Sequence, residues 1–482
     1  MTCDTSVRSS PHDDPASVEE MYRAHLATAP DDARVLGNLG GLLNDLCRFG
    51  EAERILRRSV ALDPSGWGAW SNLGNTMTER QRFGDAIAAF TNALRIRPSH
   101  APMLANLGVA LTACGAPGQA LAFLDMALAS EPGNAEMHCN RALALLASGD
   151  WIAGFAEYEW RWRTRAKPAH PYGVPLWDGS RFKGRTLLLH DEGGFGDTLQ
   201  FIRYAAAAKA LGGAVLLRVR APLATLLSRL PGIDRVIVSD APLPPFDLHC
   251  PMFSLPRLFR TTPVNVPLSD GYLRPHHDDV AVWERRLTAD PVVPGPGGLR
   301  IGLVWAGGPH PYARESALAD RRRSIRLDAF APLAEAAPDA VFYSLQKGAA
   351  SAETLHPPPG MRLIDHTASI DSFDDTAAFV SQLDLVVSVD TSTAHLAAAM
   401  GRPVWMLSRF DQCWRWLTGR ADTPWYDSMR LYRQPAPFDW ASPISDLAGD
   451  LAALRSWSRP DEAGKPRRPG AKKSSERVRS MI

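Results

Sequence analysis

The stretch Asp384–Leu407, DLVVSVDTSTAHLAAAMGRPVWML, predicts a buried strand, a polar turn, a helix and a second strand. Residues 385–389 form a short apolar run rich in β-branched residues, which is typical of a parallel strand covered on both faces. The hydroxyl residues 391–393 open an alanine-rich helix over 394–400, and a glycine and a proline end it before a strand over 404–407. Such a junction favours an anion, for instance a pyrophosphate, because it places hydroxyls and unpaired backbone N–H groups at a helix N-terminus.

The polar residues of this turn are open to two interpretations. His395 follows Thr391 by one helical turn, so both side chains lie on one face of the helix and the imidazole can point to the same crevice. Asp390 and Thr391 are also ordinary helix caps, and a histidine in a first turn is often only a surface residue. The rest of the chain favours the anion site.

Composition bounds the class of protein. A chain of 482 residues with 45% hydrophobic content is long enough for two or three domains. The 53 Lys and Arg residues nearly balance the 52 Asp and Glu residues, so bulk charge gives no argument for specific nucleic-acid binding or an acidic membrane surface. The six cysteines form no C-x-x-C pair, which argues against a zinc site or a disulfide framework. With no run of about 18 apolar residues and no leader-like start, we expect a soluble cytoplasmic protein without a transmembrane segment.

The first third of the chain is a repeat array. Asn-Leu-Gly recurs at 38–40, 72–74 and 106–108, with a period of about 34 residues. Prolines and small residues keep the same period, and the pattern resembles the tetratricopeptide repeat. Three full units are predicted over about 33–134, preceded by one helix and followed by a degenerate closing unit. Such arrays usually hold a peptide or protein segment in a concave groove, although a rigid spacer or a dimerisation surface has the same pattern.

The closing unit carries an aromatic stripe between charged residues. A nucleic-acid stacking platform has a similar composition. We favour the interpretation that these rings attach the last repeat to the next domain, because an extended proline-rich connector follows. The stripe consists of Phe155, Tyr158, Trp160 and Trp162.

The next segment predicts an α/β lobe. A strand over 186–190 runs into a glycine turn and a helix over 197–211, and strands over 214–219 and 235–238 continue the alternation. A dinucleotide fingerprint is absent, and a carboxylate at the helix start would repel a pyrophosphate. Asp197 is therefore a candidate for proton chemistry at the carboxyl end of the first strand, or a plain helix cap. Asp191 and Glu192 are alternatives nearby.

A second α/β lobe follows a linker over 291–298. Its predicted strands cover 300–305 and 341–345, with helices over 328–337 and near 375–382, and a long polar loop reaches Arg323. Two lobes of this kind imply a cleft between them. The basic residues near the end of the loop are either a solvated face or a clamp for a diphosphate. They are Arg314, Arg321, Arg322, Arg323 and Arg326.

The region from about 155 to 454 resembles bacterial tetratricopeptide glycosyltransferase-like proteins, whose catalytic part is similar to glycosyltransferase family 9, the heptosyltransferases. The stretches that carry the resemblance are YEWRW, LWDG, GFGDTLQF, PPFDLHCPMFSLP, IGLVWAG, RRRSI, FYSLQKG, DLVVSVDTSTAHLAAAMGRPVW, CWRW and SPIS. The resemblance implies the two-lobed GT-B fold, a nucleotide-diphosphate sugar bound in the C-terminal lobe, inversion at the anomeric carbon, and no need for a metal or another cofactor.

Site residues carry over by motif. Asp197 matches the general base of the family, and Gly194 and Gly196 belong to its acceptor-side loop. The donor-binding positions implied are Asp390, Thr391, Ser392, Thr393, His395, Arg323, Ser324, Gln346 and Lys347. Two departures leave the donor open, because Ser392 replaces a glycine of the motif and Arg323 stands roughly where the family carries a lysine.

The sequence therefore predicts a repeat array over 17–166, an acceptor-side lobe over 167–290, a nucleotide-sugar lobe over 299–456 and a disordered basic tail over 457–482. The expected function is transfer of a sugar from a nucleotide-diphosphate sugar to a hydroxyl of a protein or envelope glycan, with the repeats recruiting the acceptor. The alternative is a non-catalytic interaction scaffold or a nucleotide-sugar sensor.

Overall fold

The structure is a computed structural model that describes residues 14–164, 172–295, 298–308, 314–411 and 413–458. The chain divides into two compact units. The first comprises the chain up to residue 169 together with the segment 411–418, and the second comprises the remainder. The predicted combination of a helical repeat array with a parallel α/β region is confirmed.

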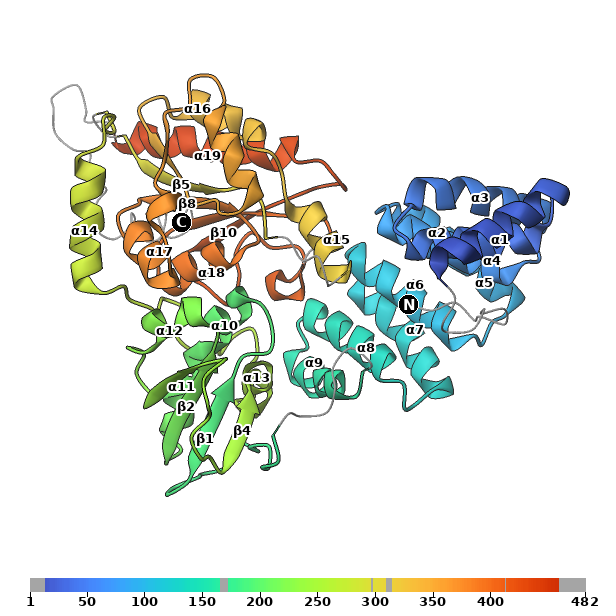
Figure 1. Cartoon of the computed structure of the whole chain (residues 1–482), viewed down its shortest axis with the longest axis horizontal. Helices are drawn as coiled ribbons and strands as arrows, with labels where there is room; N and C mark the ends of the chain where they lie inside the picture. The colour runs from blue at the N-terminus through green and yellow to red at the C-terminus, as the bar shows by residue number, and fades with distance from the viewer. Residues whose placement is uncertain (1–13, 165–171, 296–297, 309–313, 412, 459–482) are drawn as a thin grey trace. The chain divides into compact units, whose positions relative to one another are not determined.

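The first unit is a stack of helix pairs, drawn in blue to teal in Figure 1. A single helix, α1 (Pro15–Thr28), precedes three full pairs, and a shorter pair with a 3-10 turn closes the array. This is the order that the repeat pattern predicts. The bounds are α2 Ala33–Asp45, α3 Phe49–Leu62, α4 Trp67–Glu79, α5 Phe83–Ile96, α6 Ala101–Ala113, α7 Pro117–Ser130, α8 Ala135–Ser148, α9 Trp151–Glu157 and η1 Tyr158–Arg163.

The glycine of each Asn-Leu-Gly motif lets the two helices of a pair approach. A Cβ atom on Gly74 would lie 2.6 Å from a ring carbon of Phe90, and one on Gly108 would lie 2.6 Å from Cγ of Leu124. Such separations are shorter than van der Waals contact, so a larger residue would push the helices apart. The period of the sequence is thus the period of the close contacts.

The aromatic stripe of the closing unit is used in packing. The ring of Trp160 stacks on His138 with centroids 3.7 Å apart. The guanidinium of Arg161 lies over the rings of Tyr158 and Trp162, at 5.1 and 5.2 Å from their centroids. These contacts lie within the first unit, so attachment of the last repeat to the next domain stays a prediction.

The segment 411–418, far along the chain, also belongs to the first unit. In its 3-10 turn η7 (Trp414–Trp416), the ring of Trp414 packs edge-on against Trp151 and Phe155 of α9, with centroids 6.4 and 5.5 Å apart. Trp416 is fully buried. Nothing in the sequence predicts that this segment, which follows strand β9 (Val404–Ser408), packs with the repeats.

The second unit contains two α/β lobes. The first lobe has a parallel sheet in the order β3-β2-β1-β4. Its strands are β1 Thr186–His190, β2 Ala214–Val219, β3 Arg235–Val238 and β4 Leu248–Pro251. Its helices are α10 Phe195–Phe201, η2 Ile202–Tyr204, α11 Ala205–Lys209, α12 Ala221–Leu227, η3 Met252–Ser254 and α13 Leu255–Leu258, and α14 His277–Thr288 leads to the second lobe.

The second lobe has a parallel sheet in the order β10-β9-β8-β5-β6-β7, and its strands β8 and β9 are fully buried. The bounds of the strands other than β9 are β5 Arg300–Val304, β6 Val341–Ser344, β7 Leu363–Asp365, β8 Leu385–Val389 and β10 Met429–Arg433. Its helices are α15 Arg314–Arg323, η4 Leu327–Phe330, α16 Ala331–Ala336, η5 Ala349–Leu355, η6 Thr367–Ser369, α17 Phe373–Val380, α18 Ser392–Ala399 and α19 Ala441–Ser458.

Several elements differ from the expectation. The single helix predicted over 197–211 is divided by η2, where the Arg203 side chain turns back and donates to the carbonyl oxygen of Gln200. The loop predicted to reach Arg323 contains α15, which Leu318 anchors by burial. Strands β4, β7 and β10 have no counterpart among the predicted strands.

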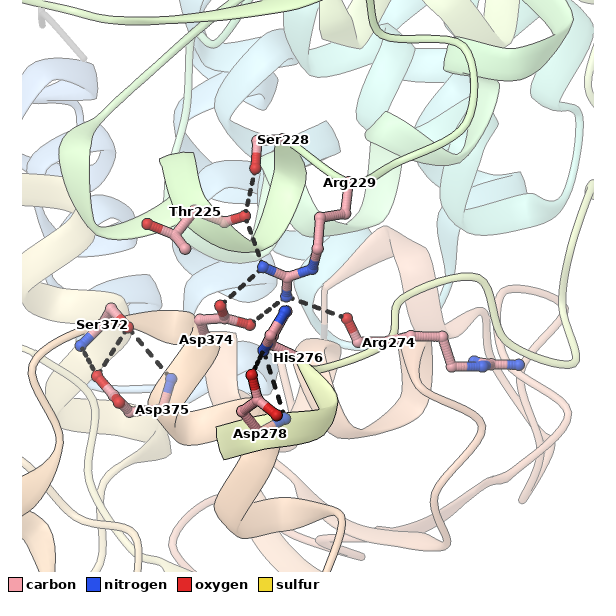
Figure 2. A network of polar contacts seen from close by, with 9 residues as sticks. All are labelled: Thr225, Ser228, Arg229, Arg274, His276, Asp278, Ser372, Asp374 and Asp375. Atoms are coloured by element: carbon pink, nitrogen blue, oxygen red, sulfur yellow. Dashed lines mark hydrogen bonds and ion pairs between the residues drawn. The ribbon is translucent and has the colours of Figure 1, made fainter. Parts of the chain in front are cut away.

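An ion pair joins the two lobes of the second unit (Figure 2). Arg229, just after α12, donates through both terminal nitrogens to the carboxylate of Asp374 in the first turn of α17, and one of these bonds is 2.9 Å long. It also donates to the carbonyl of Arg274, in the connection between the lobes. Since the side chain of Asp374 is only 5% exposed, this bidentate pair fixes α12 against α17.

Candidate functional site

The topology of each sheet indicates at which strand ends a ligand would bind. Strands β1, β2 and β3 proceed in one direction and β4 returns to the other side of β1, so the strand order reverses between β1 and β4. The order reverses in the same way between β5 and β8 in the second lobe. In open parallel sheets, ligands bind at the carboxyl ends of the strands that flank such a reversal. The predicted residues follow β1, β5, β6 and β8, and so lie at these ends.

The turn after β8 leads into a helix whose N-terminus has no side-chain cap. Thr391 is the N-cap of α18, but its hydroxyl bonds with that of Ser388 at 2.9 Å and makes no side-chain cap. Ser392 and Thr393 form the first turn, which is half-buried. The helix dipole and the first backbone N–H groups of α18 are therefore the anion-favouring features that the sequence predicts here.

His395 lies beneath this turn and is 5% exposed. Its Nε2 is 3.9 Å from Oδ1 of Asp390, and its Nδ1 is 2.9 Å from the hydroxyl of Tyr426. The imidazole is thus held between a carboxylate at the carboxyl end of β8 and a buried phenol. The structure brings Asp390 and His395 together as the motif implies.

Arg323 and Ser324 arrange the turn after β5 against the turn after β8. A terminal nitrogen of Arg323 donates to the carbonyl of Asp390 at 2.8 Å, and the guanidinium also binds Asp320 at 2.9 and 3.0 Å. The Ser324 hydroxyl accepts from the backbone N–H of Gly307 at 3.1 Å. Arg323, a member of the predicted basic cluster, thus lies beside the β8 turn.

Gln346 and Lys347 shape the turn after β6. Gln346 is buried, and its amide oxygen accepts from the backbone N–H groups of Trp305 and Ala306 at 3.1 and 2.9 Å. The Lys347 ammonium donates to the carbonyls of Thr367, at 3.2 Å, and Ile370. Both side chains therefore support neighbouring turns, and their contact with a ribose stays a prediction.

The glycine turn after β1 carries acids. The Asp197 carboxylate accepts from the backbone N–H of Gly194, the N-cap of α10, at 2.7 Å. Asp191 pairs with Arg220, whose guanidinium also donates to the carbonyl of Gly193. Burial raises the pKa of the Asp191 carboxyl, and the Arg220 charge opposes that rise. Asp197 is therefore the third residue of α10 and bonds back to the N-cap residue, rather than being the N-cap itself, and its role as a base stays a prediction.

The two turns meet where α10 packs against α18 (Figure 1). A Cβ atom on Gly196 would lie 2.8 Å from Cδ2 of His395, which is closer than side-chain atoms approach. Gly196 therefore permits the contact between the acidic turn of the first lobe and the helix start of the second. Among the described residues, this contact brings a predicted acceptor-side residue against a predicted donor-side residue.

The sequence analysis missed a buried polar cluster behind His395. Arg203 is 2% exposed and donates to the carbonyl of Trp425 at 2.8 Å and to the hydroxyl of Tyr272 at 3.2 Å. Its guanidinium also lies 4.8 Å from the ring centroids of both Tyr272 and Tyr426. Burial raises the pKa of both phenols. No periodic signal marks these residues, because they come from three separate segments.

Two further properties of the described residues concern metal binding and membrane spanning. Among the described residues, His276, His277 and Asp278 place three possible ligand atoms within 4.8 Å of one another. They stand at the start of α14 and include none of the predicted site residues. No helix in the described ranges combines the length and apolar character needed to cross a bilayer.

Comparisons with known proteins agree with both halves of this description. Tetratricopeptide-repeat family models match residues 45–101 and 77–148. The glycosyltransferase family 9 (heptosyltransferase) model matches residues 368–408, which include the β8–α18 turn. Protein FlbA of Caulobacter vibrioides is 28% identical over 307 residues, which are 58% of this chain and 48% of FlbA. The chain thus spans about half the length of this curated relative.

Solved tetratricopeptide-repeat structures are similar to part of this chain. MamA is 20% identical, with a TM-score of 0.29, and the match covers 31% of this chain and 88% of that one. A thermophilic tetratricopeptide-repeat protein of Thermus thermophilus is 22% identical, with a TM-score of 0.29 and coverage of 32% and 84%. YrrB, described as having an unusual peptide-binding site, is 20% identical, with a TM-score of 0.27 and coverage of 31% and 76%. By the family models, the chain carries tetratricopeptide repeats and a segment similar to part of family 9.

Proposed function

We propose that this chain is a glycosyltransferase with a GT-B arrangement of its two lobes, which moves a sugar from a nucleotide-diphosphate sugar to an acceptor hydroxyl. The observation that carries the proposal is the contact between Gly196 and His395. It sets a turn that carries carboxylates opposite a helix start that favours an anion, and each turn lies at the reversal point of its own sheet.

The chemistry follows from this opposition. The N-terminus of α18, together with Arg323 and His395, stabilises the negative charge that develops on the leaving diphosphate. The acceptor oxygen forms a bond to the anomeric carbon as the bond from that carbon to the diphosphate oxygen breaks. The Asp197 carboxylate takes the proton of the acceptor hydroxyl. Attack from the face opposite the leaving group inverts the anomeric carbon, and the protein's own donors supply the stabilisation without a metal.

The repeats supply the acceptor in this proposal. Tetratricopeptide arrays generally bind a peptide or protein segment in their groove, and the stacked pairs α2–α7 form such an array here. A glycan acceptor attached to a protein or to the cell envelope would be brought to the lobes in this way. The repeats carry no chemistry of their own, so they set the choice of acceptor rather than the rate of transfer.

A non-catalytic scaffold or nucleotide-sugar sensor is the second candidate. The observation in its favour is the hydrogen bond from Gly194 to Asp197, because a carboxylate that caps a helix needs no catalytic role to explain it. A sensor shares donor binding with the transferase and differs from it in turnover.

The test measures binding before turnover. The purified chain is titrated calorimetrically with UDP-glucose, GDP-mannose and ADP-glucose, and the one that binds is then incubated with candidate acceptors while release of the nucleotide is followed. We expect saturable binding that His395→Ala weakens by at least about tenfold, which corresponds to about 1.4 kcal/mol. His277→Ala is the matched control, because the side chain of His277 is 84% exposed on α14 and should leave the affinity unchanged. Binding without release with any acceptor selects the sensor, and no binding at all selects the scaffold.

A further inference from the structure

A pocket of about 480 Å³ lies between strand β10 and helix α19 of the second lobe (Figure 1). β10 is the outermost strand of its sheet, and the backbone N–H of Leu431 donates to the carbonyl of Ala421 at 2.7 Å, so the segment before β10 covers part of the free edge. The described residues that line the pocket include none of the predicted site residues. Its size is within the range of about 300–1,000 Å³ that small-molecule sites occupy. The pocket is therefore a candidate for a second ligand.

One end of the pocket contains a carboxylate whose charge is already compensated. A terminal nitrogen of Arg430 lies 2.6 Å from Oδ2 of Asp450, and the Tyr432 hydroxyl donates to the same oxygen at 2.9 Å. A charge-assisted bond and a second donor on one carboxylate hold β10 and α19 together at this point. This end of the pocket therefore offers a ligand fixed polar groups and little net charge.

Arg433 gives the pocket a positive charge at the end of β10. Its Nε donates to the carbonyl of Arg420 at 2.7 Å. Burial, together with the nearby Arg420 charge, lowers the pKa of the Arg433 guanidinium to about 10. Asp422 opposes this fall, but its carboxylate also forms a bidentate pair with Arg420, at 2.6 and 2.7 Å. A ligand that brings an oxyanion to Arg433 would stabilise the guanidinium in these surroundings.

Helix α19 forms the opposite wall. Ser445 and Asp446 are exposed and line the pocket, and Gly449 follows them by one helical turn on the same face. A serine hydroxyl both donates and accepts, and a carboxylate accepts. This wall therefore suits a ligand that carries hydroxyl groups.

Gly449 leaves the space between the two walls open. A glycine inside a helix makes the helix less stable than an alanine would. At Gly74 and Gly108 a close contact between helices accounts for the glycine, but a Cβ atom on Gly449 would meet no described part of the chain within 4 Å. Because Gly449 lines the pocket, a long side chain at this position would occupy it.

We propose that this pocket binds a small polyhydroxylated anion, a sugar phosphate or a sugar acid, with its oxyanion at Arg433 and its hydroxyl groups toward Ser445 and Asp446. The planar guanidinium matches phosphate and carboxylate equally, so the shared chemistry is an oxyanion on a hydroxylated body. The pocket is separate from the turn between β8 and α18, and the proposal does not depend on the proposed function.

The first test measures binding to the full chain by calorimetry. Glucose 6-phosphate and glucuronate are the two sources of oxyanion, and glucose and inorganic phosphate each represent one half of the ligand. We expect saturable binding of at least one anionic sugar, with glucose and inorganic phosphate at least about tenfold weaker, because each of them lacks one set of contacts. Binding of one anionic sugar alone identifies the oxyanion that the pocket takes. Failure of both, or equal affinity for glucose or inorganic phosphate, overturns the proposal.

The second test locates the bound sugar. Gly449→Met places a flexible apolar side chain in the pocket and should keep α19 helical, since methionine has a high helix propensity. We expect the affinity for the anionic sugar to fall by at least about tenfold. Gly449→Ala is the matched control, because it adds only a Cβ atom in open space. It should raise the melting temperature and change the affinity by less than about twofold.

Two further variants distinguish the pocket from the anion site proposed at the start of α18. Arg433→Met should weaken binding of the anionic sugar at least about tenfold, whereas His395→Ala should leave it unchanged. Melting temperatures show that each variant is folded. Unchanged affinity in a folded Arg433→Met or Gly449→Met protein overturns the proposal. Loss of binding in His395→Ala with full binding in Gly449→Met would assign the anion to the α18 turn and overturn it as well.

Discussion

The turns after β1 and β8 occupy equivalent places in their sheets and carry opposite chemistry. At the start of α10, the carboxylate of Asp197 accepts from the chain's own backbone. At the start of α18, the hydroxyl of Thr391 bonds with Ser388 and leaves the helix start without a side-chain cap. A helix start of the second kind keeps its donors and its dipole for an anion. The same architecture occurs twice, and a few residues give the two turns their different chemistry.

The first prediction separates the two roles of Asp197, as an acid that accepts a proton and as a helix cap. Asp197→Asn retains an oxygen that accepts from Gly194, so the stability of the helix start should change little. If Asp197 is the base, the turnover of the transfer reaction falls by about 10²- to 10⁴-fold, because the acceptor proton has no carboxylate to take it. The rate of nucleotide release and the melting temperature of the same sample are the two measurements.

Asp197→Ala is the companion variant. It loses both the base and the cap, so it should show the same loss of turnover with an added destabilisation of about 1 kcal/mol. Donor affinity should survive in both variants, since the proposed anion site lies in the other lobe. A folded Asp197→Asn protein with unchanged turnover would show that the carboxylate is only a cap.

The second prediction concerns the ion pair that keeps the lobes together. Arg229→Ala leaves the carboxylate of Asp374, whose side chain is 5% exposed, without its bidentate partner. We expect the free energy of unfolding of the second unit to fall by about 2–3 kcal/mol, because an unpaired buried carboxylate is costly and Arg229 itself is partly exposed. Urea unfolding followed by tryptophan fluorescence measures the change.

Arg420→Ala is the control for that experiment. Arg420 also forms a bidentate pair, with Asp422, but the side chain of Asp422 is 68% exposed. Exposed pairs contribute little, so this variant should lose less than about 1 kcal/mol. Equal losses in the two variants would show that burial of Asp374 is not what makes the pair between the lobes important.

The sequence predicts the regular parts of the molecule well and the long-range contacts poorly. Strands β1, β2, β3 and β8 have the bounds that their apolar runs predict, because a buried parallel strand is continuous in its hydrophobicity. The repeats are predicted equally well, because the glycine of each Asn-Leu-Gly motif allows the same close contact between two helices. Local patterns of this kind need no knowledge of the rest of the chain.

The candidate site is only partly predictable, because some of its residues come from distant segments of the chain. Asp390 and His395 stand in one motif and were found together, and the structure adds the contact with Gly196, about 200 residues earlier in the chain. Tyr426 and Arg203 reach the surroundings of the same histidine from other segments, and single buried Tyr or Arg residues leave no period in a sequence. The packing of Trp414 with the repeats escapes prediction for the same reason.

The third prediction tests the contact between the two turns. Gly196→Ala places a Cβ atom 2.8 Å from Cδ2 of His395, so the His395 ring or one of the two helices must shift. We expect a loss of about 1–2 kcal/mol in stability together with weaker binding of the proposed donor. Gly194→Ala is the matched control, because its Cβ would meet Asp197 at an ordinary 3.4 Å and its φ of −74° suits any residue. Similar losses in the two variants would argue against close approach as the reason for a glycine at 196.

The smallest expected effect lies in the charge of the acidic turn itself. Burial raises the pKa of the Asp191 carboxyl, so the folded chain holds that proton more tightly than the unfolded chain does. Its contribution to stability is therefore present at low pH and is lost as pH rises through the raised pKa. Asp191→Asn stays neutral throughout, so its stability relative to the wild type should increase between about pH 4 and about pH 7, by less than about 1 kcal/mol. Scanning calorimetry at both pH values measures the difference.

Arg220→Met should enlarge the loss of stability with rising pH while Asp191 is kept, because the Arg220 charge opposes the rise in the Asp191 pKa. If the stability of either variant changes with pH in the opposite direction, the attraction of Arg220 outweighs burial. The Asp191 carboxylate in the turn after β1 would then stay charged in the folded chain.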